Sequence, residues 1–465
     1  MSFLEKNTKL TAFRAFQHRE FRKFYVGSIA AQIGFWFSHI SYQALMSDLT
    51  KDELWVSMLF VVTFLPVLFF GPLGGLLADR FDRKKLLLGS YAALIVVSGI
   101  QVFLVAVDAI SPAILLLTSF LVGLVMAVLS PVVQAVTANT VPPGDLASAI
   151  SLQAMASNAS RVLGPALCAP LVSGNLYEIS WSLYSIGLAL ALIVASGITL
   201  LPYELEKERV PVKQSLLDGI SHARERSDAW QALLLVGFIS IFGVSHVALS
   251  PSFTENSLGK PSSYFAWLGA ATGLGALIGA LAAGSFTASS TLKRGSMFAI
   301  PYCLLLLGFS RVTNFEVAII LQVLVGFFYI ASFTTLQVVI QELVSEEFRG
   351  RVMSLFNIAW AGLVPIGTLL MGLLASSTGF DLGASNTIAL TSLACLCYVA
   401  IVVVRNFRPG RYLTAETAMY FFYNAAVNPL SRSAIISSMC SIPTDNRIRP
   451  GYTPVSACSS GVSWL

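Results

Sequence analysis

One arginine in this 465-residue chain lies inside a run of apolar residues, where a charge is costly. Arg161 falls near the middle of residues 149–174, and Gln153 and Ser157 precede it at intervals of four, which puts the three on one helix face. Inserting an arginine at the centre of a membrane helix costs about 2.5–3.5 kcal/mol, so this face is expected to meet a cavity or a neighbouring helix. Beside Asn158, the guanidinium could bind an anionic or acceptor-rich small molecule. The alternative is that it caps carbonyls of a neighbouring helix.

Proton transfer inside a membrane needs a side chain that titrates there, and this chain offers few. No Asp or Glu lies in the middle of an apolar run. His39 and His246 lie deepest, and imidazole is the side chain that changes charge near neutral pH. Asp48, at the end of the first run, is the third candidate. The alternative is that both histidines are hydrogen-bonded residues of helix packing.

A charged hairpin, GPLGGLLADRFDRKK at residues 71–85, connects the second and third apolar runs. Glycines at the end of a span let a neighbouring helix approach closely, and Asp79 and Arg83, four residues apart, can share a helix face. The bases lie where anionic headgroups would be. We predict a gating loop that contains Gly75, Asp79, Arg80, Arg83 and Lys84. The alternative is a stop-transfer cluster, which any membrane hairpin could carry.

This hairpin resembles the loop between helices 2 and 3 of the major facilitator superfamily, whose pattern is Gly-x-Leu-Ala-Asp-Arg-x-Gly-Arg-Arg/Lys. The pattern is filled in order by Gly75, Leu77, Ala78, Asp79, Arg80, Arg83 and Lys84. Asp82 stands where the pattern has Gly. With QELVSEEFRGRVMSLFN at residues 341–357, the chain resembles the branch of enterobactin exporters and drug efflux proteins, the transmembrane secretion effectors, over most of residues 12–405.

The resemblance implies a fold and a second gating element. The fold is an all-α membrane protein with twelve transmembrane helices in two pseudo-symmetric six-helix bundles. The second gating element contains Arg349, Gly350 and Arg351. We predict that Asp79 accepts hydrogen bonds from free N–H groups at the start of the eleventh helix, near Gly350, where the helix dipole favours a carboxylate by about 0.3–2 kcal/mol. That contact would close the cytoplasmic gate.

The resemblance also implies a central cavity lined by helices 1, 4, 7 and 10. Amide side chains on these helices, with the polar face of the fifth, supply its hydrogen-bonding groups. The expected cavity residues are Gln32, Gln134, Gln153, Asn158, Arg161, Gln322 and Gln337. Gly164-Pro165 resembles the Gly-Pro element of exporters in helix 5, although Cys168 and Ala169 replace the further glycines of that pattern.

Composition and spacing agree with a membrane protein. Hydrophobic residues make up 55% of the chain and charged residues 11%, which no soluble domain of this length shows. Apolar runs of about 20 residues, enough to cross the hydrocarbon, recur twelve times. We predict spans near 24–47, 55–77, 86–107, 112–138, 149–174, 179–201, 230–250, 263–286, 296–310, 316–340, 351–375 and 386–404.

The charged segments divide the chain into five parts. These are a cytoplasmic amphipathic segment (1–23), a six-helix bundle (24–201), a cytoplasmic linker (202–229), a second six-helix bundle (230–405) and a cytoplasmic, largely disordered tail (406–465). With both termini inside, 25 of the 29 Lys and Arg residues fall on the cytoplasmic side, as cytoplasmic loops require. The predicted location is a bacterial-type inner membrane, crossed many times.

Several classes of function are excluded or disfavoured. Neither a nucleotide-binding loop nor an enzymatic motif is present, and the six cysteines show no metal-binding spacing. The net charge of +5 is scattered between apolar runs, which argues against nucleic acid. We expect no cofactor or metal, a monomer, and lipid and a small molecule as partners. The predicted function is proton-antiport export of a small amphiphilic molecule, such as a drug or a siderophore. The alternatives are a proton-coupled or facilitative importer of a polar nutrient, and a transporter-like sensor.

Overall fold

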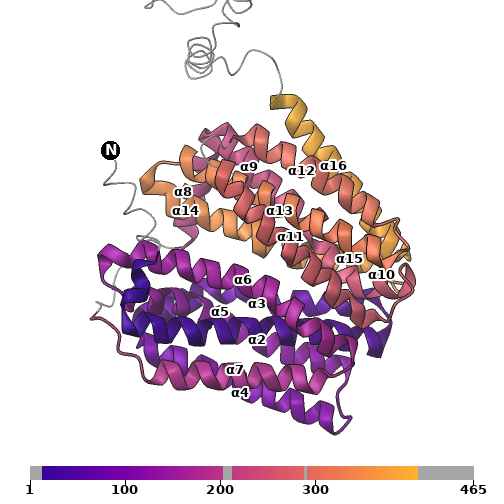
Figure 1. Ribbon diagram of the computed structural model, residues 1–465. Coiled ribbons are helices and arrows are strands. Elements are labelled where there is room, and N and C mark those ends of the chain that lie inside the picture. Colours follow the sequence, from indigo (N-terminus) through magenta and orange to yellow (C-terminus); the bar gives the residue numbers. More distant parts are fainter. Residues whose placement is uncertain (1–12, 203–211, 287–290, 407–465) are drawn as a thin grey trace, which may run out of the picture. The chain divides into compact units, whose positions relative to one another are not determined.

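The structure, a computed structural model, describes residues 13–202, 212–286 and 291–406. Over these ranges it is all-helical, without a strand, as the composition predicts (Figure 1). Residues 407–465 lie outside the described residues, as do most of the N-terminal segment and part of the linker. The predictions of a disordered tail and of termini inside the cell therefore stay predictions.

The first half contains six long helices, which lie together in the lower part of Figure 1. A short 3-10 helix η1 (Arg14–Gln17) precedes them, and η2 (Pro143–Asp145) lies between the fourth and the fifth. The six are α2 (Arg19–Thr50), α3 (Glu53–Arg80), α4 (Arg83–Ala106), α5 (Pro112–Asn139), α6 (Leu146–Ser173) and α7 (Tyr177–Ser196).

The second half follows the linker helix α8 (Val212–Glu225) and repeats this plan. Two of its spans are interrupted helices. The first of them consists of α9 (Ser227–Phe238), the π-helical η3 (Ile239–Gly243), η4 (Val244–Leu249) and α10 (Ser250–Asn256). The other consists of α14 (Glu346–Asn357), the π-helical η7 (Ile358–Gly362) and α15 (Val364–Ala375). The remaining elements are η5 (Ser262–Tyr264), α11 (Phe265–Phe286), α12 (Leu292–Phe309), α13 (Phe315–Leu343) and α16 (Gly383–Asn406).

Ten of these helical segments are long and apolar enough to cross a membrane. The two long helices that fail this criterion are α2 and α6, which have 32 and 28 residues. Their length is sufficient, but polar side chains lower their hydropathy. These are also the helices that carry His39 and Arg161, so the segments with the weakest membrane signal hold the residues with the most chemistry.

Side-chain caps explain several helix starts. Asp52, Asp82 and Ser111 each accept a backbone N–H from the first turn of α3, α4 or α5. Thr291 and Asn314 do the same for α12 and α13. A cap satisfies N–H groups that a helix cannot pair internally, so these polar residues place the loops where the apolar runs end.

The described part of the N-terminal segment packs against the protein. Ala15 and Phe21 are fully buried against the start of α6, and the Ala15 N–H donates to the Ser148 hydroxyl at 3.1 Å. Arg14 and His18 both bind Asp145. From Phe13 onward, the predicted amphipathic segment is therefore a packed lead-in to α2, which the sequence pattern did not distinguish from a surface helix.

Close helix approach at the charged hairpin is found at one of the three glycines expected to permit it. A side chain at Gly74 would lie 2.2 Å from the carbonyl oxygen of Ala127, so α3 and α5 touch there. Gly71 and Gly75 have open space around the position of a side chain. The expectation is therefore confirmed for Gly74 and wrong for Gly71 and Gly75.

Candidate substrate site and gates

Arg161 of α6 lies against an aromatic ring of the other half. Its guanidinium carbon is 4.3 Å from the centre of the Trp360 ring, which belongs to the π-helical segment η7. A cation over an indole face is stabilised by about 0.5–2 kcal/mol, more as water is excluded. Arg161 was expected to meet a cavity or a neighbouring helix. It meets an aromatic ring of the other half of the protein.

The irregular helix η7 positions Trp360. π-Helical turns add a residue to the helix and often occur at functional sites. Gly362, at the end of this turn, lies close to α3, because a side chain there would fall 2.8 Å from Leu68. The Trp360 indole N–H donates to the Tyr329 hydroxyl at 2.7 Å. The ring is therefore held by a hydrogen bond within its own half while its face meets Arg161.

His39 is enclosed by aromatic side chains. Its ring is 2% exposed, and Phe35, Trp36, Phe60 and Phe64 surround it with ring centres 4.8–5.9 Å away. Its Nε2 has no hydrogen-bond partner among the residues that the structure describes. We call this group the His39 cage. Aromatic faces can stabilise an imidazolium in place of a carboxylate.

The Gly164-Pro165 element of α6 contacts this cage. A side chain at position 164 would lie 2.3 Å from the Trp36 Cβ, so only glycine permits this approach. Arg161 is one helical turn before Gly164. The predicted Gly-Pro element and Arg161 therefore lie on the same helix, one beside the His39 cage and the other beside Trp360.

His246 has a different environment. Its Nδ1 is 2.6 Å from the Gly243 carbonyl oxygen, and the residue lies in η4, just after the π-helical turn η3. It packs against Phe309. This hydrogen bond satisfies a carbonyl at the helix interruption, as the alternative interpretation of helix packing proposed. Of the two histidines, His39 alone has its buried Nε2 left without a partner among the described atoms.

The predicted cavity amides separate into groups. Gln32 and Gln153 meet at the Ser28 hydroxyl, at 3.0 and 2.6 Å, and link α2 to α6. Gln322 is buried, and its carbonyl oxygen accepts from Thr272 at 2.8 Å, so in this conformation it packs α13 against α11 and does not line an open cavity. Gln134 and Asn158 are exposed and Gln337 is half-buried.

The charged hairpin is held by one ion pair within it and by hydrogen bonds to two neighbouring segments. Asp79 is 8% exposed and lies 3.7 Å from the Arg83 guanidinium, which also donates to the Asn139 side chain at 2.6 Å. Lys84 donates to the Ile198 carbonyl at 2.8 Å. Arg80 is exposed. The hairpin thus ties the C-terminal ends of α3, α5 and α7 together.

The second gating element needs one correction. Helix α14 begins at Glu346, so Gly350 is its fifth residue and its N–H belongs to the helix's own hydrogen-bond ladder. The N–H groups that an α-helix cannot pair internally belong to its first turn, and here the Phe348 N–H already donates to the Ser345 carbonyl oxygen at 3.1 Å. A contact between Asp79 and this helix stays a prediction, directed at the first turn. Arg349 is exposed and makes contacts of its own.

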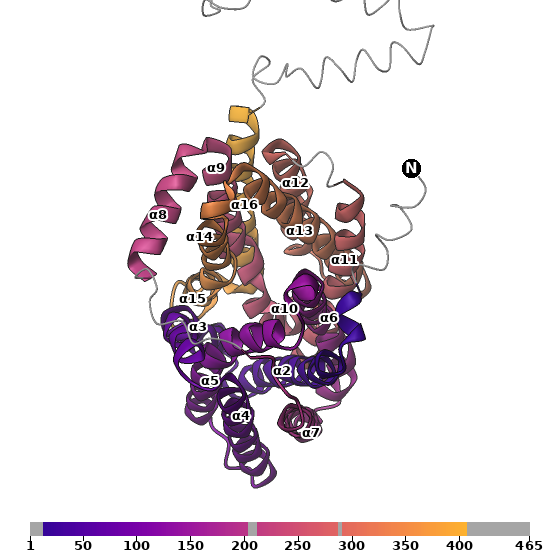
Figure 2. The same cartoon turned by 90° about the vertical axis from the view of Figure 1, so that its left-hand side faces the viewer.

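Arg351 binds the linker helix. Its guanidinium donates to Asp218 of α8 at 2.7 Å and lies over the Phe348 ring. The His222 ring stacks on Phe348, with 4.4 Å between the ring centres and the two rings nearly parallel. Figures 1 and 2 show α8 beside α14. We call these four residues the linker clamp.

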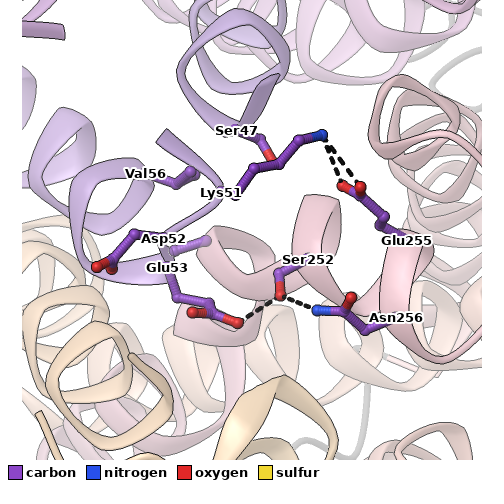
Figure 3. A pocket seen from close by; sticks show the side chains of 9 residues that line it. Ser47, Lys51, Asp52, Glu53, Val56, Ser252, Glu255 and Asn256 are labelled. Carbon is purple, nitrogen blue, oxygen red and sulfur yellow. Dashed lines mark hydrogen bonds and ion pairs between the residues drawn. The ribbon is translucent and has the colours of Figure 1, made fainter. Parts of the chain in front are cut away.

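The turn between α2 and α3 joins the two halves at the opposite end from the charged hairpin. Lys51 donates to Glu255 of α10 at 3.0 and 3.2 Å. Glu53 accepts from Ser252, and Asp48 accepts from Ser262 at 2.6 Å. A pocket of about 240 Å³ lies beside these bonds (Figure 3). It is lined by Ser47, Lys51, Asp52, Glu53, Val56, Ala248, Ser252, Glu255 and Asn256. Asp48, a predicted proton carrier, thus bridges the halves at the rim.

The sequence did not predict a role for Trp360, Lys51, Glu255 or Asp218. Trp360 resembled any apolar residue of a span, and the charged residues resembled ordinary loop charges. Each acquires its role from a partner at least 31 positions away, as the bond from Trp360 to Tyr329 shows. The available signals were Gly362, two residues after Trp360, and the charge density of the 51–53 turn.

Sequence comparison finds relatives of this chain among transport proteins. The chain is 26% identical to macrolide efflux protein A of Streptococcus pyogenes over 349 residues, covering 72% of this chain and 84% of that protein. It is 22% identical to the staphyloferrin A transporter of Staphylococcus aureus over 380 residues, covering 79% and 94%.

Solved transporters share the fold. A bacterial homologue of the human lysosomal transporter Spinster, in an inward-facing and unoccupied conformation, superposes with a TM-score of 0.62 at 16% identity, covering 83% of this chain and 95% of that one. A D-xylose–proton symporter gives 0.62 at 12% identity, covering 82% and 96%. The sequence profile of the family described as transmembrane secretion effector matches residues 10–421. The chain therefore belongs to the transmembrane secretion effector family, transporters of the major facilitator superfamily.

Proposed function

We propose that this membrane transporter exports a small amphiphilic molecule by alternating access, driven by proton antiport. The observation that carries the proposal is the contact between Arg161 and Trp360. It joins the two halves near the middle of α6, and it involves the single formal charge in the middle of the spans. A contact of this kind can form or break as the halves move, and a cargo bound beside it would bias the two states.

Export rather than import is supported by the family and by the printed names of its relatives. The family is described as secretion effectors, and one relative is a macrolide efflux protein. The Gly164-Pro165 element, which touches the His39 cage through Trp36, is the feature on this chain that resembles exporters.

The His39 cage supports proton coupling. The His39 Nε2 is buried with no hydrogen-bond partner in the described part of the chain, and four aromatic rings surround the imidazole. Protonation would place a cation among ring faces, each able to contribute about 0.5–2 kcal/mol. We assign the proton to His39 and the cargo to the neighbourhood of Arg161, with access controlled at the inner end by the charged hairpin and at the outer end by the rim around Lys51.

Inverted membrane vesicles with an acid lumen test the proposal. A radiolabelled macrolide and staphyloferrin A, the cargoes that relatives' names print, are added outside, with protein-free vesicles as the control. We expect at least one to accumulate inside and the gradient to collapse faster in its presence. Accumulation only when the gradient is reversed would show import and contradict export.

The inner gate has its own test. Asp79→Asn keeps the shape of the side chain and removes the charge that binds Arg83. We expect normal membrane insertion and a turnover reduced by a few-fold to tens-fold, since the helix-dipole interaction is worth about 0.3–2 kcal/mol. Lys85→Gln, at an exposed position of the same hairpin outside the predicted gating residues, is the matched control. Equal turnover in wild type and Asp79→Asn would contradict the gate.

A further inference from the structure

Arg161 presents hydrogen-bond donors that nothing in the described protein accepts. A guanidinium carries five N–H donors in one plane. Among the residues that the structure describes, it lies against the Trp360 ring and near Tyr329, and it makes neither a hydrogen bond nor an ion pair. Such a group near the middle of a membrane span is expensive unless something binds it.

The geometry leaves the edge of the guanidinium available. The Arg161 guanidinium carbon lies 4.3 Å from the Trp360 ring centre, and a cation over a ring keeps N–H groups for other acceptors. Arg161 and Trp360 are only partly buried. The edge is the part that matches the two oxygens of a carboxylate in a bidentate arrangement.

The charge balance selects the sign of the ligand. No Asp or Glu lies in the middle of any span, so Arg161 contributes the one formal charge at this depth. A cationic ligand would meet a like charge without a counter-ion, whereas an anion would form a pair. The difference in binding free energy between an anion and a cation is larger in a membrane interior than at a protein surface, because the dielectric constant is lower there.

The wall beside Arg161 suits an apolar body. Phe333 lies 4.9 Å from Trp360 between ring centres, and Phe356 lies 4.9 Å from Phe333. Tyr329 is 6.0 Å from Phe333 and holds the Trp360 indole. Tyr329, Phe333 and Trp360 are partly exposed and form what we call the aromatic wall, and Phe356, which is 1% exposed, packs behind Phe333. Aromatic side chains bind rings and alkyl groups without strict geometry.

We propose that Arg161 and the aromatic wall form a binding site for a carboxylate-bearing amphiphile, with the carboxylate on the guanidinium edge and the apolar body on Trp360 and Phe333. This inference rests on the proposed function and names its cargo class. It makes Arg161 a specificity-determining residue, and Trp360 the residue that orients the guanidinium through its face.

Equilibrium binding to the purified full-length protein in detergent provides the test. Three fluorescent probes share one body and differ in charge: dansylglycine carries a carboxylate, dansylglycinamide is neutral and dansylcadaverine is cationic. We expect dansylglycine to bind about tenfold or more tightly than the amide, since hydrogen bonds to a charged group are strong in such a site. The cation should bind weakest.

Variants separate recognition from folding. Arg161→Gln should abolish the preference for dansylglycine while leaving dansylglycinamide binding within about twofold of wild type. Arg161→Lys keeps the positive charge but lacks the planar guanidinium that binds a carboxylate through two N–H groups. It should therefore retain part of the preference for dansylglycine. Arg311→Gln removes a loop arginine that binds Asn386 and should change nothing. Size-exclusion profiles of all variants show whether each one folds.

Two results would overturn the site. One is equal affinity of wild type for the acid and the amide, or saturable binding of none of the probes. The other is an equal loss for all three probes in folded Arg161→Gln, which indicates a structural arginine. Failure of this site can be distinguished from failure of the proposed function. Selective binding of dansylglycine without vesicle transport contradicts the proposed function alone. Uphill export of a cation that Arg161→Gln does not affect contradicts this site alone.

Discussion

The Lys51 ammonium lies 3.0 and 3.2 Å from the two carboxylate oxygens of Glu255, and this ion pair connects the first half of the protein to the second (Figure 3). Both side chains are more than a third exposed, which limits the strength of the pair to about 0–1 kcal/mol. The bonds from Ser252 to Glu53 and from Ser262 to Asp48 cross between the halves beside it. The rim therefore closes by several weak bonds acting together.

Lys51→Gln should loosen that rim. We expect labelling of a cysteine introduced by Val56→Cys, in the pocket wall, to quicken by up to about fivefold, the equivalent of a 1 kcal/mol shift. Lys260→Gln removes the same charge from an exposed loop position and serves as the control. Adding Glu255→Gln to Lys51→Gln should have little further effect, because the pair is already broken. Additive effects of the two changes would argue against a direct pair.

His39→Gln should uncouple transport from the proton gradient. Glutamine can hydrogen-bond but cannot become cationic inside the ring cage, so gradient-driven accumulation in inverted vesicles should fall about tenfold or more while downhill exchange continues. His246→Gln is the matched control. It loses a bond to the Gly243 carbonyl and should lower thermal stability but keep coupling. Wild-type accumulation by folded His39→Gln would remove His39 from the mechanism.

The linker clamp should protect α8 from proteolysis. Asp218 and Arg351 are each a little over a quarter exposed and 2.7 Å apart, so replacing either should favour local opening of α8. We expect Asp218→Asn or Arg351→Gln to raise the rate of tryptic cleavage after Arg224 and Arg226 several-fold.

Ser221→Ala, at an exposed position of α8, is the comparison for the clamp variants. A double variant that is cleaved no faster than either single one would indicate a shared bond. Identical cleavage rates in all variants would mean that the clamp residues do not hold α8.

Glu20 gives a pH-dependent contribution to stability. The backbone N–H of Thr199 donates to its carboxylate at 2.9 Å, with Lys23 at 3.0 Å, and these donors lower the pKa of Glu20 below its ordinary value. The contribution is therefore present above the ordinary pKa and is lost as the pH falls through the lower folded-state pKa.

In detergent, Glu20→Gln should lower the melting temperature at pH 7 by at most about 2 °C. The difference from wild type should vanish near pH 3. A difference that grows toward low pH would contradict the assigned sign.

The sequence by itself determined where the long helices lie. Hydropathy depends only on local composition, so the predicted spans match helices α2 to α7 and the segments from α9 to α16 to within a few residues at most ends. The hairpin pattern around Asp79 identified the superfamily before any contact was known. Helices α2 and α6 were predicted as apolar runs like the others, although they lack the clear membrane signal of the ten other segments.

The tertiary structure alone decided which polar residues act together. Arg161 was expected to find a partner, but an aromatic ring 199 positions later could not be inferred from an apolar stretch. His39 and His246 are equivalent by position in the chain, and only their surroundings separate a caged imidazole from one that binds a carbonyl. The physical reason is that membrane insertion depends on the composition of each successive segment of the chain. Charge pairing and ring packing depend instead on which helices touch in the folded protein.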